Sequence, residues 1–120
     1  TAYASMLKKS MGNIDWTMDA DRIERLVRGL NSWPGTFTKI HGKTVKIWDC
    51  DVVCQETLTE SQAAATPGTV IVSEKDQLIV KAGNGALSLR MLQPEGKKNM
   101  TVDAYLRGYP IAHGEVFTQV

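Results

Sequence analysis

Histidine and cysteine are scarce in this sequence, which excludes most metal and nucleophile chemistry. The 120 residues include two histidines, His41 and His113, and two cysteines, Cys50 and Cys54. Each histidine precedes a glycine, and neither has a cysteine or a second histidine at metal-ligand spacing. No Ser or Cys nucleophile motif accompanies them. We therefore expect no metal ion, and we interpret both histidines as turn residues.

Long apolar runs and a strong excess of charge are also missing. No stretch approaches the roughly 18 to 20 apolar residues that a membrane helix needs. The start, Thr1-Ala2-Tyr3-Ala4, lacks the basic and then apolar pattern of a signal peptide. We expect a cytoplasmic protein without membrane association, whose cysteines are reduced. The net charge of +1 gives no overall attraction to nucleic acid, so RNA contacts would need local basic clusters.

The composition is typical of one compact globular domain. Hydrophobic residues make up 42% of the chain and charged residues 22%, and no internal repeat is visible. Residues 1–13 are predicted to be an interdomain linker remnant, and residues 14–120 a single domain.

The clearest helical pattern precedes Pro34. Its apolar residues follow i, i+3, i+4 and i+7 spacing: Ile23, Leu26, Val27 and Leu30. Thr17 or Asp19 is available as the N-cap, and the helix should end near Asn31 because Pro34 disfavours helical backbone just before it.

Beyond this helix the chain reads as short strands. We predict five of them: Thr36–Ile40, Thr44–Val53, Thr69–Ser73, Leu78–Lys81 and Ala86–Leu92. Residues 58–68 are predicted to form a surface loop. After the last strand and Pro94-Glu95-Gly96, we predict a short helix with Thr101 as its N-cap and Gly108 at its C-terminal end. This helix would plug one end of a barrel.

His41-Gly42 is predicted to be a two-residue hairpin turn, which fixes the pairing of the strands beside it. Ile40 then lies opposite Lys43, and Phe37 opposite Lys46. One face carries Ile40, Val45 and Ile47 toward the core, and the other carries Phe37, Lys39, Lys46 and Trp48.

Aromatic rings among lysines are typical of oligonucleotide-binding barrels, which stack bases and attract phosphates. The alternative is that Phe37 and Trp48 pack beneath the helix or a neighbouring domain while the lysines are solvated. A second basic pair, Lys97-Lys98, lies on a predicted loop, where it could reach phosphates or remain solvated.

No catalytic group is predicted from the residues. The turn Gly83-Asn84-Gly85 has no helix after it and so lacks the amides of a phosphate-binding loop. No carboxylate pair, such as Asp49 and Asp51, has the apolar surroundings that would hold a proton at neutral pH.

Several segments resemble, in order and spacing, the C-terminal domain of methionyl-tRNA formyltransferases. They are Gly12-Asn13-Ile14-Asp15-Trp16, Ile23-Glu24-Arg25 with Arg28, Asn31–Thr36, Val45–Trp48, Pro67-Gly68-Thr69 and Leu92–Met100. The Leu-Gln-Pro-x-Gly-Lys-Lys-x-Met stretch points most specifically to this family. Ser32 departs from the family pattern, where a proline is usual.

The resemblance implies a mainly β fold: an open Greek-key, OB-like barrel with one N-terminal amphipathic helix and a short C-terminal helix. It implies a parent enzyme that moves a formyl group from 10-formyltetrahydrofolate to the methionine of initiator methionyl-tRNA. Catalysis and folate binding would belong to an N-terminal catalytic domain, so this chain should hold no catalytic residue and no cofactor.

The role implied for this domain is contact with the tRNA backbone. The candidate contacts are Lys39, Lys43, Lys46, Lys97 and Lys98, with Arg107 as a weaker sixth. The helix residues Arg22, Arg25 and Arg28 rank lower because they can pair with neighbours such as Asp21 and Glu24. The alternative is a packing module without RNA contacts in a related formyltransferase acting on a folate or nucleotide-sugar substrate.

Overall fold

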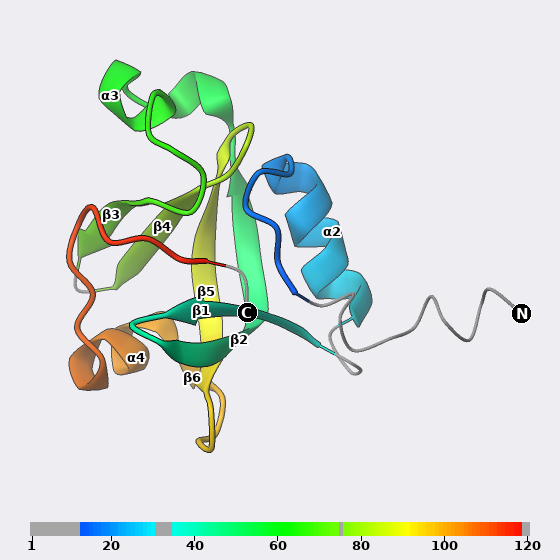
Figure 1. Cartoon of the computed structure of the whole chain (residues 1–120), viewed down its shortest axis with the longest axis vertical. Helices are drawn as coiled ribbons and strands as arrows, with labels where there is room; N and C mark the ends of the chain where they lie inside the picture. Colours follow the sequence, from blue (N-terminus) through cyan, green and yellow to red (C-terminus); the bar gives the residue numbers. More distant parts are fainter. Residues whose placement is uncertain (1–12, 31–34, 75, 119–120) are drawn as a thin grey trace, which may run out of the picture.

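The computed structural model describes residues 13–30, 35–74 and 76–118, and these form one sheet with helices around it (Figure 1). Its elements in chain order are α2 (Ala20–Leu30), β1 (Thr36–Ile40), β2 (Lys43–Val53), a 3-10 turn (Gln55–Thr57), α3 (Glu60–Ala63), β3 (Val70–Glu74), β4 (Gln77–Lys81), β5 (Ala86–Pro94), β6 (Met100–Thr101) and α4 (Val102–Gly108). The predicted linker, apart from Asn13, lies outside the described residues, as do Asn31, Ser32 and Pro34.

The strands are antiparallel and lie in the order β1-β2-β5-β4-β3, and β6 pairs with β5. Three consecutive strands, β3 to β5, form a meander whose last member returns beside β2, which is Greek-key connectivity. The edge strands β1 and β3 do not pair with each other. The prediction of a mainly β, open barrel-like fold is confirmed.

A C-terminal segment, residues 114–118, spans the gap between the two edge strands (Figure 1). On the β3 side, the Val70 amide donates to the Glu115 carbonyl at 2.7 Å and the Phe117 amide donates to the Gly68 carbonyl at 2.8 Å. On the β1 side, Lys39 and Thr118 exchange two backbone hydrogen bonds of 2.9 Å. The segment thereby satisfies edge groups that would otherwise be open to pairing with another chain.

The approach of this segment requires glycine at position 68. Gly68 has φ +93°, and a Cβ built there would lie 2.4 Å from the Phe117 carbonyl oxygen. Phe117 is 2% exposed, and its ring packs against that of Trp16 with centroids 5.8 Å apart. The Trp16 indole N–H donates to the Thr38 hydroxyl at 2.9 Å, and Thr38 donates to the Thr118 carbonyl at 2.8 Å. The buried polar groups are therefore satisfied where the barrel closes.

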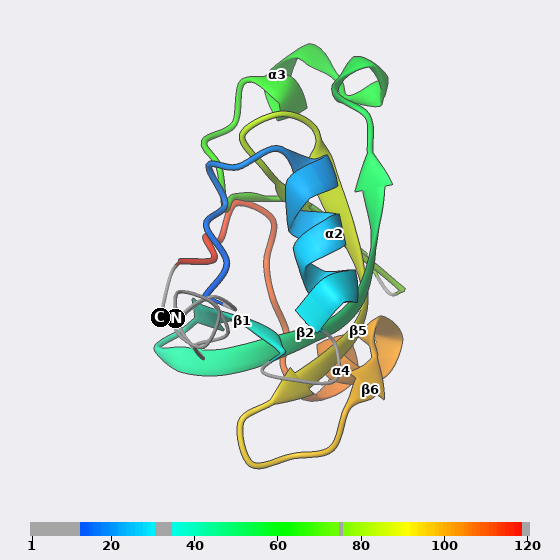
Figure 2. The same cartoon turned by 90° about the vertical axis from the view of Figure 1, so that its right-hand side faces the viewer.

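Helix α2 runs along β2 and covers one face of the sheet (Figure 2). Ile23 and Val27 of the predicted apolar stripe are buried. In the first turn of the helix, the Ile23 amide donates to the Asp19 carbonyl at 3.1 Å. The turn at residues 83–85 fixes the start of the helix, because the Ala20 amide donates to the Asn84 carbonyl at 2.9 Å. The predicted helix is confirmed, and Asp19 occupies its N-cap.

The predicted loop at residues 58–68 was wrong in part, because it contains α3. Thr59 and Gln62 form a capping box in which each side chain accepts from the other residue's backbone amide. Thr101 does precede α4, as predicted. However, its hydroxyl donates to the Asp103 carboxylate instead of capping an amide.

Both cysteines are free, and their surroundings differ. Cys50 is buried in the core and Cys54 is exposed just beyond the end of β2. Burial raises the pKa of the Cys50 thiol to about 12. The described chain contains no helix long and apolar enough to cross a membrane.

If the segment at 114–118 closes the barrel, Phe117→Ala should lower the free energy of unfolding by about 3 to 5 kcal/mol, because it leaves a cavity against Trp16. Val116→Ala is the matched control. Its side chain is 46% exposed, so it should cost no more than about 0.5 kcal/mol. Urea denaturation followed by tryptophan fluorescence measures both, and similar losses would contradict this account of closure.

Candidate nucleic-acid interface

The β1–β2 hairpin carries three of the predicted basic contacts and adopts the predicted register. Ile40 pairs with Lys43, Lys39 with Thr44 and Phe37 with Lys46. Both turn residues have positive φ, 53° at His41 and 75° at Gly42, as in the two-residue turns that fit strand twist. The sequence prediction of this hairpin is confirmed.

The outer face of the hairpin holds a hollow of about 250 Å³ beside Lys46. Phe37, Thr44 and Gln93 also line it, but Phe37 is only 8% exposed and lies outside the main core cluster. Trp48 is half-buried, and its indole N–H donates to the Gln93 side chain at 2.7 Å. Phe37 and Trp48 therefore do not form the open platform of aromatic rings among lysines that the sequence suggested.

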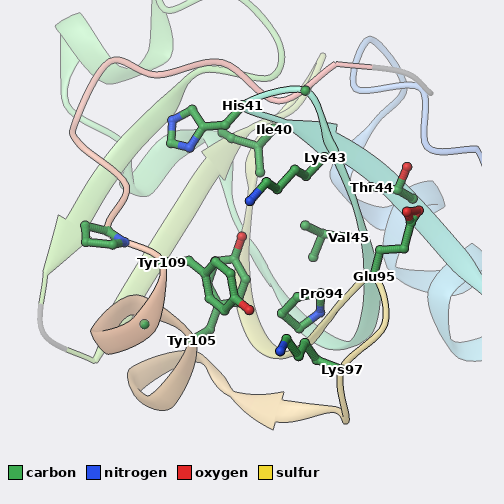
Figure 3. Close-up of a pocket in the computed structure, with 13 residues that line it drawn as sticks. Ile40, His41, Lys43, Thr44, Val45, Pro94, Glu95, Lys97, Tyr105 and Tyr109 are labelled. Carbon is green, nitrogen blue, oxygen red and sulfur yellow. The ribbon is translucent and has the colours of Figure 1, made fainter.

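A larger hollow of about 560 Å³ lies at the end of the barrel, between the hairpin, the turn after β5 and α4 (Figure 3). We call it the tyrosine pocket. Its lining residues are Ile40, His41, Gly42, Lys43, Thr44, Val45, Pro94, Glu95, Lys97, Tyr105, Gly108, Tyr109 and Pro110. Within it, the rings of Tyr105 and Tyr109 stack at 5.0 Å with an interplanar angle of 18°.

The two hollows share one wall, formed by Thr44, Pro94 and Glu95. Lys46 therefore lies on one side of this wall, and Lys43 and Lys97 lie on the other. Lys39 lines neither hollow, but it pairs with Thr44 across the hairpin.

The turn after β5 has a defined shape that places its lysines. The Lys97 amide donates to the Pro94 carbonyl at 3.0 Å, and the Gln93 side chain donates to the Lys97 carbonyl at 2.8 Å. Both Lys97 and Lys98 are exposed. Three of the predicted lysines, at positions 43, 46 and 97, thus line two hollows that share one wall, and Lys98 follows Lys97 in the same turn.

Arg107 is placed apart from these lysines. It lines neither hollow, borders a different hollow beside Ser73 and Ile111, and lies 3.9 Å from the Asp103 carboxylate. On α2, Arg28 pairs with Glu24 at 3.1 Å, as the sequence suggested for the helix arginines. These arginines line neither hollow.

Lys81 is a basic residue that is buried and therefore does not contribute to the basic surface. Its side chain is 2% exposed, and its ammonium group donates to the Ala82 carbonyl at 2.5 Å. Burial lowers its pKa below the ordinary 10.5. The predicted strand ended at this residue, but no sequence signal marked the lysine as buried.

The tip of the hairpin is tied to the closing segment by His41, whose Nε2 contacts the Glu115 carboxylate. The other Glu115 oxygen accepts from the Ala112 amide at 2.7 Å. This amide, and then His41, hold the pKa of Glu115 below its ordinary 4.5.

These features define a class of protein: an open, barrel-like antiparallel β domain with a basic surface at one end. Within the described residues, no group of three side chains could hold a metal ion. The family model described as "Formyl transferase, C-terminal domain" matches residues 6–110. The chain belongs to this family, which confirms the resemblance seen in the sequence.

Curated relatives named methionyl-tRNA formyltransferase are similar over nearly the whole chain. The protein from Agathobacter rectalis is 40% identical over 97% of this chain and 36% of its own length, and that from Caldanaerobacter subterraneus subsp. tengcongensis is 43% identical over 95% and 35%. The chain thus spans about a third of the length of these relatives.

Among solved structures, HypX from Aquifex aeolicus has a similar fold. A variant of it aligns with a TM-score of 0.66 and 18% identity over 90% of this chain and 18% of HypX. HypX in complex with tetrahydrofolic acid aligns with a TM-score of 0.66 and 17% identity, over 92% and 21%. At these identities the likeness concerns the fold.

The Glu115 contacts predict a pH-dependent contribution to stability. Because the folded pKa of Glu115 is below 4.5, its carboxylate stabilises the fold at pH above 4.5, and this contribution is lost as the pH falls through the folded value. Glu115→Gln should therefore lower the melting temperature at pH 6, and the difference from wild type should shrink toward pH 3. Calorimetry at both pH values measures this, and a constant difference would contradict it.

Proposed function

We propose that this chain is the tRNA-binding C-terminal domain of a methionyl-tRNA formyltransferase. The parent enzyme would transfer the formyl group of 10-formyltetrahydrofolate to the methionine of initiator tRNA in the cytoplasm. The observation that carries the tRNA role is that Lys43, Lys46 and Lys97 line two hollows that share the wall formed by Thr44, Pro94 and Glu95. The exposed Lys98 follows Lys97 in the same turn. Family membership and the names of the curated relatives support the proposed identity of the parent enzyme.

The proposal assigns catalysis and folate binding to an N-terminal domain and gives this domain a positioning role. Lysine ammonium groups reach phosphate oxygens without reading sequence, so they can fix the orientation of a tRNA while the catalytic domain engages the acceptor end. Lys43, Lys46, Lys97 and Lys98 are proposed as the principal contacts. Lys39 would reach phosphate at the edge of this surface, and Arg107 is the weakest candidate because Asp103 partly neutralises it.

The local arrangement of charge matters more than the net charge of +1. Within the described chain, the acidic residue on the shared wall is Glu95, whereas lysines lie on both sides of it. Attraction between exposed ammonium groups and phosphates acts over about one Debye length, 8 to 10 Å at physiological ionic strength, so the local lysines count for more than distant charges.

A packing module remains the second candidate, in which this face contacts another domain of a related formyltransferase that uses a folate or nucleotide-sugar substrate. Membership of the formyl transferase C-terminal family is compatible with it, because that membership does not itself require an RNA contact. Salt separates the two candidates, because phosphate contacts weaken steeply with salt and an apolar interface does not.

Binding of fluorescent initiator tRNA to this chain should fall as salt rises. Replacing Lys46, Lys97 and Lys98 together with alanine should remove about 0.7 to 0.9 per lost contact from the slope of log affinity against log salt, or roughly 2 to 3 in all. Anisotropy titrations at several salt concentrations measure the slope.

The charge-matched control replaces Arg22, Arg25 and Arg28 on α2 with alanine. These residues lie outside both hollows, so this variant should keep most of the wild-type slope. Equal losses in both variants would show that only total charge matters. No binding at low salt by a folded chain would favour the packing module.

A further inference from the structure

The tyrosine pocket contains features that backbone attraction alone does not require. Its volume of about 560 Å³ falls within the range of pockets that hold small ligands, roughly 300 to 1,000 Å³. Its walls come from three separate parts of the chain: the β1–β2 hairpin, the turn after β5, and α4 with the residues that follow it. A phosphate on a flat surface would need none of this enclosure.

The aromatic wall of this pocket is formed by two stacked tyrosine rings. Tyr105 is 3% exposed and its ring is stacked on that of Tyr109, which is half-buried and lies just after α4. The Tyr109 amide donates to the Tyr105 carbonyl at 2.7 Å, which fixes the backbone between the two rings. Tyr109 thus offers ring surface to the pocket at little cost in conformational freedom.

Lysines flank this aromatic wall from two directions. In Figure 3, the Lys43 side chain reaches down from the hairpin and the Lys97 side chain lies across the pocket from it, with the tyrosine rings between them in this view. The acidic Glu95 side chain points away from the rings, toward Thr44. His41, at the tip of the hairpin, contacts the Glu115 carboxylate.

Aromatic stacking flanked by ammonium groups is the arrangement that holds unstacked nucleotides in single-stranded nucleic-acid sites. We propose that the tyrosine pocket binds one unpaired nucleotide of an RNA, with its base against Tyr109 and its flanking phosphates on Lys43 and Lys97. A base paired within a helix could not enter, so the pocket would select an unpaired or unstacked position. This inference rests on the proposed tRNA-binding function and adds a defined subsite to it.

The test uses this 120-residue chain and a single-stranded RNA tetranucleotide, with a short RNA duplex and AMP as comparison probes. Chemical-shift titration of backbone amides should show changes at residues 40–45, 94–97 and 105–110 with the tetranucleotide. The duplex should produce smaller changes there. AMP should bind more weakly than the tetranucleotide if the natural ligand is RNA, and at least as well if it is a free nucleotide.

Four variants isolate the two contacts. Tyr109→Phe keeps the ring and should bind the tetranucleotide like wild type, whereas Tyr109→Leu should weaken binding about five- to hundredfold. Lys97→Gln should also weaken it. Arg90→Gln removes one exposed positive charge outside the pocket, where Arg90 pairs with Asp51 at 3.0 Å, and should have little effect.

Failure of this inference is distinguishable from failure of the proposed function. If initiator tRNA binds with a strong salt dependence but the tetranucleotide does not bind, or binds equally well to Tyr109→Leu, the nucleotide pocket is wrong and the tRNA surface stands. If neither RNA binds, both are wrong. If Tyr109→Leu does not fold, the wild-type titration decides: changes centred elsewhere than the tyrosine pocket overturn the inference.

Discussion

The bridge that residues 114–118 form between the two edges of the open sheet is the constraint on which the rest of the structure depends. Without it, β1 and β3 would present unpaired backbone groups at two open edges. Phe117 anchors the segment against Trp16, and Thr118 bonds to both the backbone of Lys39 and the hydroxyl of Thr38. The hairpin that carries three candidate contacts is therefore held in place by residues almost eighty positions further along the chain.

The pairing of β2 with β5 explains how a chain with a net charge of +1 can form a basic surface. The hairpin brings Lys43 and Lys46 to opposite sides of one wall, and the turn after β5 adds Lys97 and Lys98. The charges are local because the fold gathers them at one end of the barrel. We propose that the side of the wall with Lys46 attracts backbone phosphates and that the tyrosine pocket, on the other side, accepts a nucleotide.

Features set by neighbouring residues, such as turns and helices, were predictable from the sequence. Features set by contacts between distant segments were not. The two-residue turn at His41-Gly42 fixed the hairpin register, and apolar spacing identified α2. Hairpin register alone left two possibilities for Phe37, an exposed ring or a packed one, and the folded chain buries it to 8% exposure. The tyrosine pocket was missed because Lys43, Lys97 and Tyr109 meet only when three segments fold together, although the family itself was recognisable from its motifs.

The most direct test of the central claim is to map initiator tRNA onto this chain by following its backbone amide resonances at low salt. The account predicts that the largest changes fall at residues 43–46 and 94–98, on the wall between the two hollows. It also predicts that α2 and the β3–β4 hairpin remain nearly unchanged. Changes centred on α2, or spread evenly over the surface, would contradict it.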